Sequence, residues 1–184
     1  MAVDDNIPAA LPDELERALS VGDAAFVREA IAKYGVRVLN ISPTWCADST
    51  LYGQAVVAAE DNEFVPLETL VDAGVRGDEV VDSIYGATPL HDAVRRAPEV
   101  VRRFLAAGAN PDVRDNYGET PLMTAARSYR WGDWGRERSA ISVKYLLEAG
   151  ADASLRRGDG KTALELALEQ PIVVPEVIQL LMKR

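Results

Sequence analysis

Two side chains in this 184-residue sequence are of types that often catalyse reactions or bind metals, the single histidine His91 and the single cysteine Cys46. His91 has no serine, cysteine or aspartate around it in the arrangement that activates a nucleophile. Cys46 lacks the neighbouring cations that lower a thiol pKa. One cysteine and one histidine are also too few for a tetrahedral zinc site. No phosphate loop and no metal-spaced carboxylates occur, so we expect no catalysis, no cofactor and no metal.

Tyrosines at repeated positions suggest a different chemistry, the binding of another protein. Tyr52, Tyr85 and Tyr117 each directly precede a glycine and lie 33 and 32 residues apart. Tyrosine is common among residues that dominate interface energy, because it offers a large contact area with few rotatable bonds. We therefore expect a row of tyrosines that anchors a partner. The alternative is local packing of these rings between adjacent turns.

The tyrosines belong to a repeated segment, and a second repeated segment alternates with it. The first reads Tyr85-Gly-Ala-Thr-Pro-Leu-His91, Tyr117-Gly-Glu-Thr-Pro-Leu-Met123 and Asp159-Gly-Lys-Thr-Ala-Leu-Glu165. The second reads Leu70-Val-Asp-Ala-Gly74, Phe104-Leu-Ala-Ala-Gly108 and Leu146-Leu-Glu-Ala-Gly150. A fixed period of about 33 residues predicts a repeat architecture.

Each repeat predicts two short helices. Thr88 is suited to cap the first helix, and Pro89 is suited to its first position because proline has helical φ and no N–H to leave unpaired. The second helix has apolar residues at helical spacing and ends at a glycine such as Gly108. Neither helix can bury its apolar face alone, so the pairs must stack into one continuous core.

These motifs closely resemble the ankyrin-repeat family, whose signature contains G-x-T-P-L-H-x-A, an apolar second helix and a G-A-x-x-N/D ending. The resemblance implies an all-α repeat solenoid of helix-turn-helix pairs joined by β-turn or hairpin fingers. We expect a tail at residues 1–10 and a single ankyrin-repeat domain over residues 11–184. Its repeats are expected at about 11–40, 51–83, 84–116, 117–158 and 159–184. The departures in the second and fifth repeats, where Thr-Pro is incomplete, fit terminal capping repeats.

The resemblance also implies a concave surface, formed by the fingers and the first helices, that holds a partner. Its variable positions at the ends of the first helices fall on Arg95, Arg96 and Arg127, and on the acidic pair Glu60 and Asp61 in the second repeat. The surface would therefore change sign along its length, although a merely solvated face is the alternative. For His91 the resemblance implies a structural hydrogen-bonding role near the turn.

Two insertions break the period and bring tryptophan and arginine into the repeats. The first lengthens the finger over residues 41–48 and contains Trp45, which we expect to contact a partner or to cover the N-terminal repeat. The second, residues 128–139, is expected to leave the stack between two helices and contains Trp131 and Trp134. Tryptophan and arginine are common binding hot spots. The alternative is that the tryptophans fold back on neighbouring repeats.

Charge and hydropathy limit the class of partner and the cellular location that we expect for the protein. The net charge of −9 disfavours nucleic acid, because binding to the phosphate backbone depends on lysine and arginine. The acids are concentrated in residues 1–83, which hold 16 acids and 5 bases, so a basic surface on the partner is expected. No segment approaches the roughly 20 apolar residues of a membrane span, and the acidic N-terminus differs from a secretory signal. We expect a cytoplasmic monomer that contacts no membrane.

The resulting prediction is a non-enzymatic module that binds a protein partner through its concave surface of fingers and inner helices. The alternative is a small cytoplasmic inhibitor or immunity-type protein that neutralises a toxin or an enzyme by blocking it. A neighbouring reading frame that encodes a toxic enzyme, with rescue of growth on co-expression, would separate the second possibility from the first.

Overall fold

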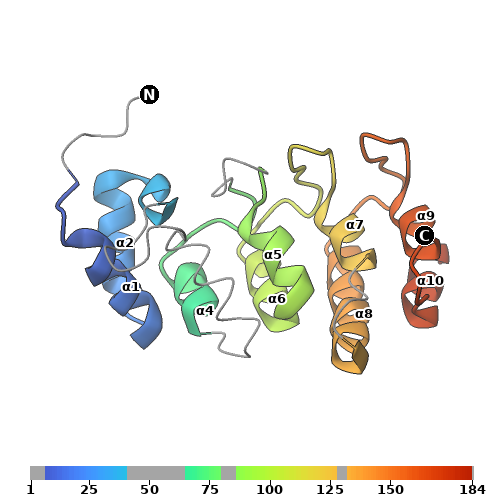
Figure 1. Cartoon of the computed structure of the whole chain (residues 1–184), viewed down its shortest axis with the longest axis horizontal. Helices are drawn as coiled ribbons and strands as arrows, with labels where there is room; N and C mark the ends of the chain where they lie inside the picture. The colour runs from blue at the N-terminus through green and yellow to red at the C-terminus, as the bar shows by residue number, and fades with distance from the viewer. Residues whose placement is uncertain (1–6, 41–64, 80–85, 128–131, 184) are drawn as a thin grey trace. The chain divides into compact units, whose positions relative to one another are not determined.

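The computed structural model describes residues 7–40, 65–79, 86–127 and 132–183, and every regular element in these ranges is a helix (Figure 1). The chain divides into two compact units, Met1–Val75 and Arg76–Arg184. The predicted all-α repeat solenoid is confirmed, and a single domain over residues 11–184 remains a prediction.

The N-terminal unit contains the helix pair expected for the first repeat. Helix α1 (Leu11–Val21) ends at Gly22, which adopts the left-handed conformation with a φ of 83°. Helix α2 (Ala24–Tyr34) begins directly after it, and the Asp23 side chain caps this helix by accepting the Phe26 N–H at 3.1 Å. A two-residue turn of Gly22 and Asp23 therefore joins the two helices. A short 3₁₀ helix, η1 (Val36–Asn40), follows.

Helix α4 (Val65–Asp72) packs against both α1 and α2 and completes the described part of this unit. The core side chains are fully buried leucines and valine contributed by all of these elements: Leu15, Leu19, Val27, Leu39 and Leu70. Gly74, with a φ of 88°, follows α4 at the position that the repeated segment predicts for a helix end. Residues 51–64, the first half of the predicted second repeat, lie outside the described residues.

The described part of the C-terminal unit contains three helix pairs. They are α5 (Pro89–Arg96) with α6 (Pro98–Ala106), α7 (Pro121–Ala126) with α8 (Gly132–Glu148), and α9 (Ala163–Leu168) with α10 (Pro175–Met182). Each first helix begins after a threonine in extended conformation, as predicted. The Thr162 hydroxyl accepts the Glu165 N–H at 3.3 Å, and the Glu165 carboxylate accepts the Thr162 N–H at 2.7 Å. This reciprocal capping pairs two N–H groups that the helix itself leaves unpaired.

Two fingers precede α7 and α9, and we call them the 110–119 finger and the 152–161 finger. Both project from the same end of the helix pairs (Figure 1). Each closes on itself through a backbone hydrogen bond, from the Asp115 N–H to the Glu119 carbonyl at 3.0 Å and from the Arg157 N–H to the Lys161 carbonyl at 2.9 Å. The fingers are also joined to each other, because the Gly158 N–H donates to the Tyr117 carbonyl at 3.2 Å.

Most of the second insertion belongs to a helix, which differs from the expected segment between two helices. Helix α8 begins at Gly132 and is 17 residues long, so residues 132–139 are helical rather than looped. The physical reason is tertiary contact at the end of the insertion. The Ser139 hydroxyl donates to the Ala125 carbonyl at 2.6 Å, and Ser139 and Ala140 are both buried. Residues 128–131 lie outside the described residues.

Two large apolar side chains on the helices of the last repeat are exposed. Leu168 lies six residues after its capping threonine, as do Val94 and Ala126 in the two preceding repeats. Val94 is 0% exposed and Ala126 is 7% exposed, because the next helix pair covers them, whereas Leu168 is 55% exposed. Met182, at the end of α10, is exposed as well.

Candidate protein-binding groove

A groove runs along the finger side of the C-terminal unit and consists of two adjoining hollows, of about 600 and about 330 Å³. Both hollows are lined by Tyr117, Glu119 and Arg127. The larger hollow continues toward the 152–161 finger, and the smaller one continues toward α5. The other lining residues are Arg157, Gly158 and Asp159 in the larger hollow, and Ala87, His91, Asp92, Arg95, Asp115 and Thr124 in the smaller one.

Tyr117 lies at the tip of the 110–119 finger and is 61% exposed. Its backbone is nevertheless held on both sides. The Tyr117 N–H donates to the Asp115 carboxylate at 2.9 Å, and its carbonyl accepts the Gly158 N–H of the neighbouring finger. Gly118 follows with a φ of 73°, a conformation that glycine adopts without strain. The finger therefore presents an aromatic ring to solvent from a fixed backbone.

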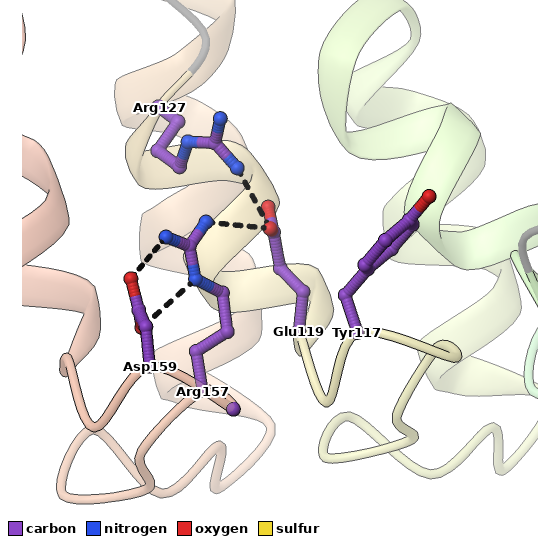
Figure 2. A pocket seen from close by; sticks show the side chains of 6 residues that line it. Tyr117, Glu119, Arg127, Arg157 and Asp159 are labelled. Carbon is purple, nitrogen blue, oxygen red and sulfur yellow. Dashed lines mark hydrogen bonds and ion pairs between the residues drawn. The ribbon is translucent and has the colours of Figure 1, made fainter.

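Glu119 is the centre of a charge network on the floor of the groove (Figure 2). Its Oε2 atom lies 2.7 Å from Nη1 of Arg127 and 3.3 Å from Nη1 of Arg157, and its Oε1 atom accepts the Thr124 hydroxyl at 3.1 Å. The side chain is only 10% exposed. One buried carboxylate therefore joins its own finger, the end of α7 and the next finger.

Asp159 extends the network at its far end. Arg157 donates from Nε to Oδ1 of Asp159 at 3.1 Å and from Nη2 to Oδ2, so the two side chains pair through both nitrogens (Figure 2). Hydrogen bonding to Asp159 raises the pKa of Arg157, and hydrogen bonding to Arg157 holds the pKa of Asp159 well below its ordinary value. Arg157 and Asp159 therefore both stay charged throughout the neutral pH range.

His91 is buried beneath the smaller hollow and connects α5 to the 110–119 finger. Its Nδ1 atom accepts the Thr88 N–H at 3.3 Å, and its Nε2 atom lies 3.0 Å from the Glu119 carbonyl. Because a carbonyl can only accept, Nε2 carries the proton and the ring is neutral. Burial lowers the pKa of His91. These contacts support the structural role that the family resemblance implies.

Replacing His91 by glutamine is expected to remove a pH dependence of stability. The pKa of His91 is about 6.5 in the unfolded chain and lower in the folded one, so the unfolded state binds more protons just below pH 6.5. The free energy of unfolding should therefore fall as the pH drops from 7 to 5.5, by at most about 1.4 kcal/mol per pH unit. The His91→Gln variant should show a flat profile in urea titrations over this range, because the chain has no other histidine. An unchanged slope in the variant would contradict this assignment.

The structure brings three of the predicted binding residues to the groove, namely Tyr117, Arg95 and Arg127. Arg95 is exposed on α5 and makes no hydrogen bond or ion pair within the described part of the chain. The Arg127 side chain is 43% exposed even though it pairs with Glu119. Two guanidinium groups therefore line the same hollow as the tyrosine ring.

The other predicted binding residues are not tested. Tyr52, Tyr85, Trp45 and Trp131 lie outside the described residues. Arg96 belongs to α5 and Trp134 to α8, but the structure does not describe their side chains. These six, like the three in the groove, remain predicted binding residues.

Glu119, Arg157 and Asp159 form most of the network and were not among the predicted binding residues. The sequence does place an acid, Glu119, directly before the capping Thr120 and an arginine, Arg157, 38 residues later in the next finger. This spacing indicates an ion pair only if adjacent fingers are already known to lie side by side.

Two further classes of site are absent from the described ranges. No cluster of three or more histidine, cysteine, aspartate or glutamate residues there could hold a metal ion. None of the helices placed in those ranges has the length and apolar character needed to cross a membrane.

Comparison with known proteins identifies the repeats. The family model described as ankyrin repeats (3 copies) matches residues 55–134 and 97–184. B-cell lymphoma 3 protein of Homo sapiens is 35% identical over 136 residues, which is 70% of this chain and 27% of that protein. Putative ankyrin repeat protein R664 of Acanthamoeba polyphaga mimivirus is 24% identical over 118 residues, which is 62% of this chain and 67% of that protein. E3 ubiquitin-protein ligase KEG of Arabidopsis thaliana is 24% identical over 190 residues, or 94% of this chain but only 11% of that protein. The chain thus belongs to the ankyrin-repeat family.

Proposed function

We propose that this protein is a non-enzymatic interaction module that binds a protein partner in the groove formed by its fingers and inner helices. Ankyrin repeats generally mediate protein–protein interaction, which supports the class. The observation that carries the proposal is Tyr117, an exposed ring on a backbone fixed from both sides. A rigid aromatic residue loses little conformational entropy when a partner covers it.

The surroundings of Tyr117 also suit a protein partner. The groove is open, and its lining residues include three arginines and four carboxylates. Small-molecule pockets instead enclose most of their ligand. Tyrosine and arginine are two of the residue types that contribute most to binding energy between proteins.

The distribution of charge supports a partner that also has a basic surface. Residues 1–75 contain 13 acids and 4 bases, and residues 76–184 contain 16 of each, so the N-terminal unit carries the whole net charge of −9. A basic partner would be attracted to that unit over a distance, and its association should slow as salt rises, since salt screens long-range attraction.

Replacing Tyr117 by alanine is expected to weaken partner binding by about 2 kcal/mol, or roughly thirtyfold, since the ring supplies contact area at the centre of the groove. The partner is first identified with a photoreactive phenylalanine analogue at position 117 in extracts of the native cell. Calorimetry with the purified partner then compares the wild-type chain with the Tyr117→Ala variant.

Tyr145 supplies the matched control. It lies on α8, and its hydroxyl donates to Glu99 of α6 at 3.2 Å, so it is not a groove residue. The Tyr145→Ala variant should bind the partner as the wild-type chain does, and the photoreactive analogue at position 145 should not crosslink it. Equal losses in both variants, or crosslinks only from position 145, would contradict binding in the groove.

A further inference from the structure

We infer that the groove binds an acidic side chain of the partner, with its carboxylate between the guanidinium groups of Arg95 and Arg127 and its backbone beside the Tyr117 ring. The inference rests on the proposed function and adds the chemistry of the group that is recognised. The reason is that the carboxylates of the groove mostly accept hydrogen bonds from within the protein, whereas most N–H donors of the two arginines do not donate within the part of the chain that the structure describes.

Most of the strong acceptors in the groove are already occupied. Glu119 accepts from Arg127, Arg157 and Thr124. Asp159 accepts from two nitrogens of Arg157 and from the Lys161 N–H. A cationic group of a partner would have to compete with these internal pairs.

Asp115 is also engaged inside the protein. Its Oδ1 atom accepts the N–H groups of Tyr117 and Glu119 at 2.9 and 2.8 Å, which closes the turn of the 110–119 finger. This carboxylate therefore shapes the finger that presents Tyr117.

The donors are occupied to a much smaller extent. Arg95 has five N–H donors, and none of them is used within the described part of the chain. Arg127 uses Nη1 for Glu119, and its side chain remains 43% exposed. Guanidinium groups bind carboxylates through two parallel hydrogen bonds, a geometry that favours this partner over other acceptors.

The net charge of the lining residues determines whether an acidic group is attracted over a distance or held only after contact. Asp92 and Asp115 line the same hollow as the two arginines, so the hollow has no positive net charge that would attract acids from a distance. Recognition must then come from short, directed hydrogen bonds after contact. This contact should affect the dissociation rate more than the association rate, because long-range steering depends on the net field.

A cationic ligand is the opposite possibility, since the face of a tyrosine ring attracts lysine and arginine. Arg95 and Arg127 would repel such a ligand at the position where it would have to lie. Asp92 and Asp115 line the same hollow, but Asp115 already accepts two backbone N–H groups. The methylene groups of an acidic residue can pack on the ring.

The test is a selection of 12-residue peptides from a random display library on the full chain, with counter-selection on the Tyr117→Ala variant. The selected peptides should share an aspartate or glutamate at a fixed position. Each is then synthesised with that residue as the acid and as the matching amide, and the affinities are measured by fluorescence anisotropy. The amide form should bind about tenfold more weakly, as expected for the loss of a charge-assisted hydrogen bond.

Arg95→Gln is the decisive variant, because Arg95 is exposed and makes no hydrogen bond or ion pair among the described residues, so its replacement should leave the fold unchanged. This substitution should weaken binding of the acid peptide about tenfold and leave binding of the amide peptide unchanged. Arg127→Lys keeps a positive charge beside Glu119 but loses the parallel N–H donors of the guanidinium group. It should therefore also weaken binding of the acid peptide. Arg102→Gln is the control, because Arg102 lies on α6, pairs with Glu99 and lines neither hollow.

The outcomes separate this inference from the proposed function. Peptides that depend on Tyr117 but bind equally as acid and amide, or that are rich in lysine and arginine, overturn the inference and leave groove binding intact. Peptides that bind the Tyr117→Ala variant as well as the wild-type chain, or a complete absence of binders, count against both.

Discussion

Replacing Val94 by aspartate is expected to lower the free energy of unfolding by about 4 kcal/mol, whereas Leu168→Asp should cost less than about 1 kcal/mol. The two residues occupy equivalent positions in the third and fifth repeats. Val94 is 0% exposed, so the new carboxylate would be buried without a partner, whereas Leu168 is 55% exposed and its replacement would stay in water. Urea unfolding followed by far-UV circular dichroism measures both changes.

Ala126, the equivalent residue of the fourth repeat, is the internal control. It is 7% exposed, and Ala126→Asp should destabilise the protein nearly as much as Val94→Asp. A large loss for Leu168→Asp would mean that something covers this residue in solution and would contradict an exposed apolar face on the last repeat.

The repeat boundaries could be predicted from the sequence because local chemistry determines them. Thr88 with Pro89 and Thr120 with Pro121 combine a capping hydroxyl with a residue that already has helical φ, and α5 and α7 begin at these prolines. Gly108, like the other turn glycines, adopts positive φ. Such signals act within a few residues, so they survive changes elsewhere in the chain.

The N-terminal extension of α8 could not be predicted in the same way. Residues 132–139 contain two glycines, which disfavour a helix, and the apolar spacing there is irregular. The helix depends instead on contacts with the neighbouring helix, such as the hydrogen bond from Ser139 to the Ala125 carbonyl. The hydrogen bond joins residues 14 positions apart, and helix propensity, which depends on each residue alone, cannot predict it.

The groove shows the same division between local and distant information. Tyr117 and the two arginines could be proposed because equivalent positions in each repeat fall on one surface. The pairing of Glu119 with Arg127 and Arg157 could not, since it links residues 8 and 38 positions apart through side chains whose directions depend on the folded fingers. Repetition therefore predicts where residues lie, but it does not predict which of them pair.

Glu119→Gln is expected to destabilise the C-terminal unit by about 2 kcal/mol and to loosen the 152–161 finger. Removing the charge leaves Arg127 without its carboxylate and Arg157 with Asp159 alone. Loss of one partner from a fully buried ion pair costs about 3–5 kcal/mol, and the smaller value follows because the arginine side chains are 43% and 20% exposed. Urea unfolding gives the free energy, and amide hydrogen exchange gives the local effect.

The Gly158 amide is the most informative probe of that local effect. It donates to the Tyr117 carbonyl, so its exchange reports whether the two fingers remain joined. The Glu119→Gln variant should speed exchange at Gly158 and, because this bond fixes the backbone of Tyr117, should also weaken partner binding.

Glu169→Gln is the matched control. Glu169 pairs with Lys161 at 2.6 Å, but both side chains are well exposed, and removing such a pair costs only a few tenths of a kcal/mol. Similar effects of the two substitutions would show that Glu119 contributes no more than a surface carboxylate. A selective effect of Glu119→Gln on Gly158 exchange and on binding would show that this buried charge holds the binding surface in place.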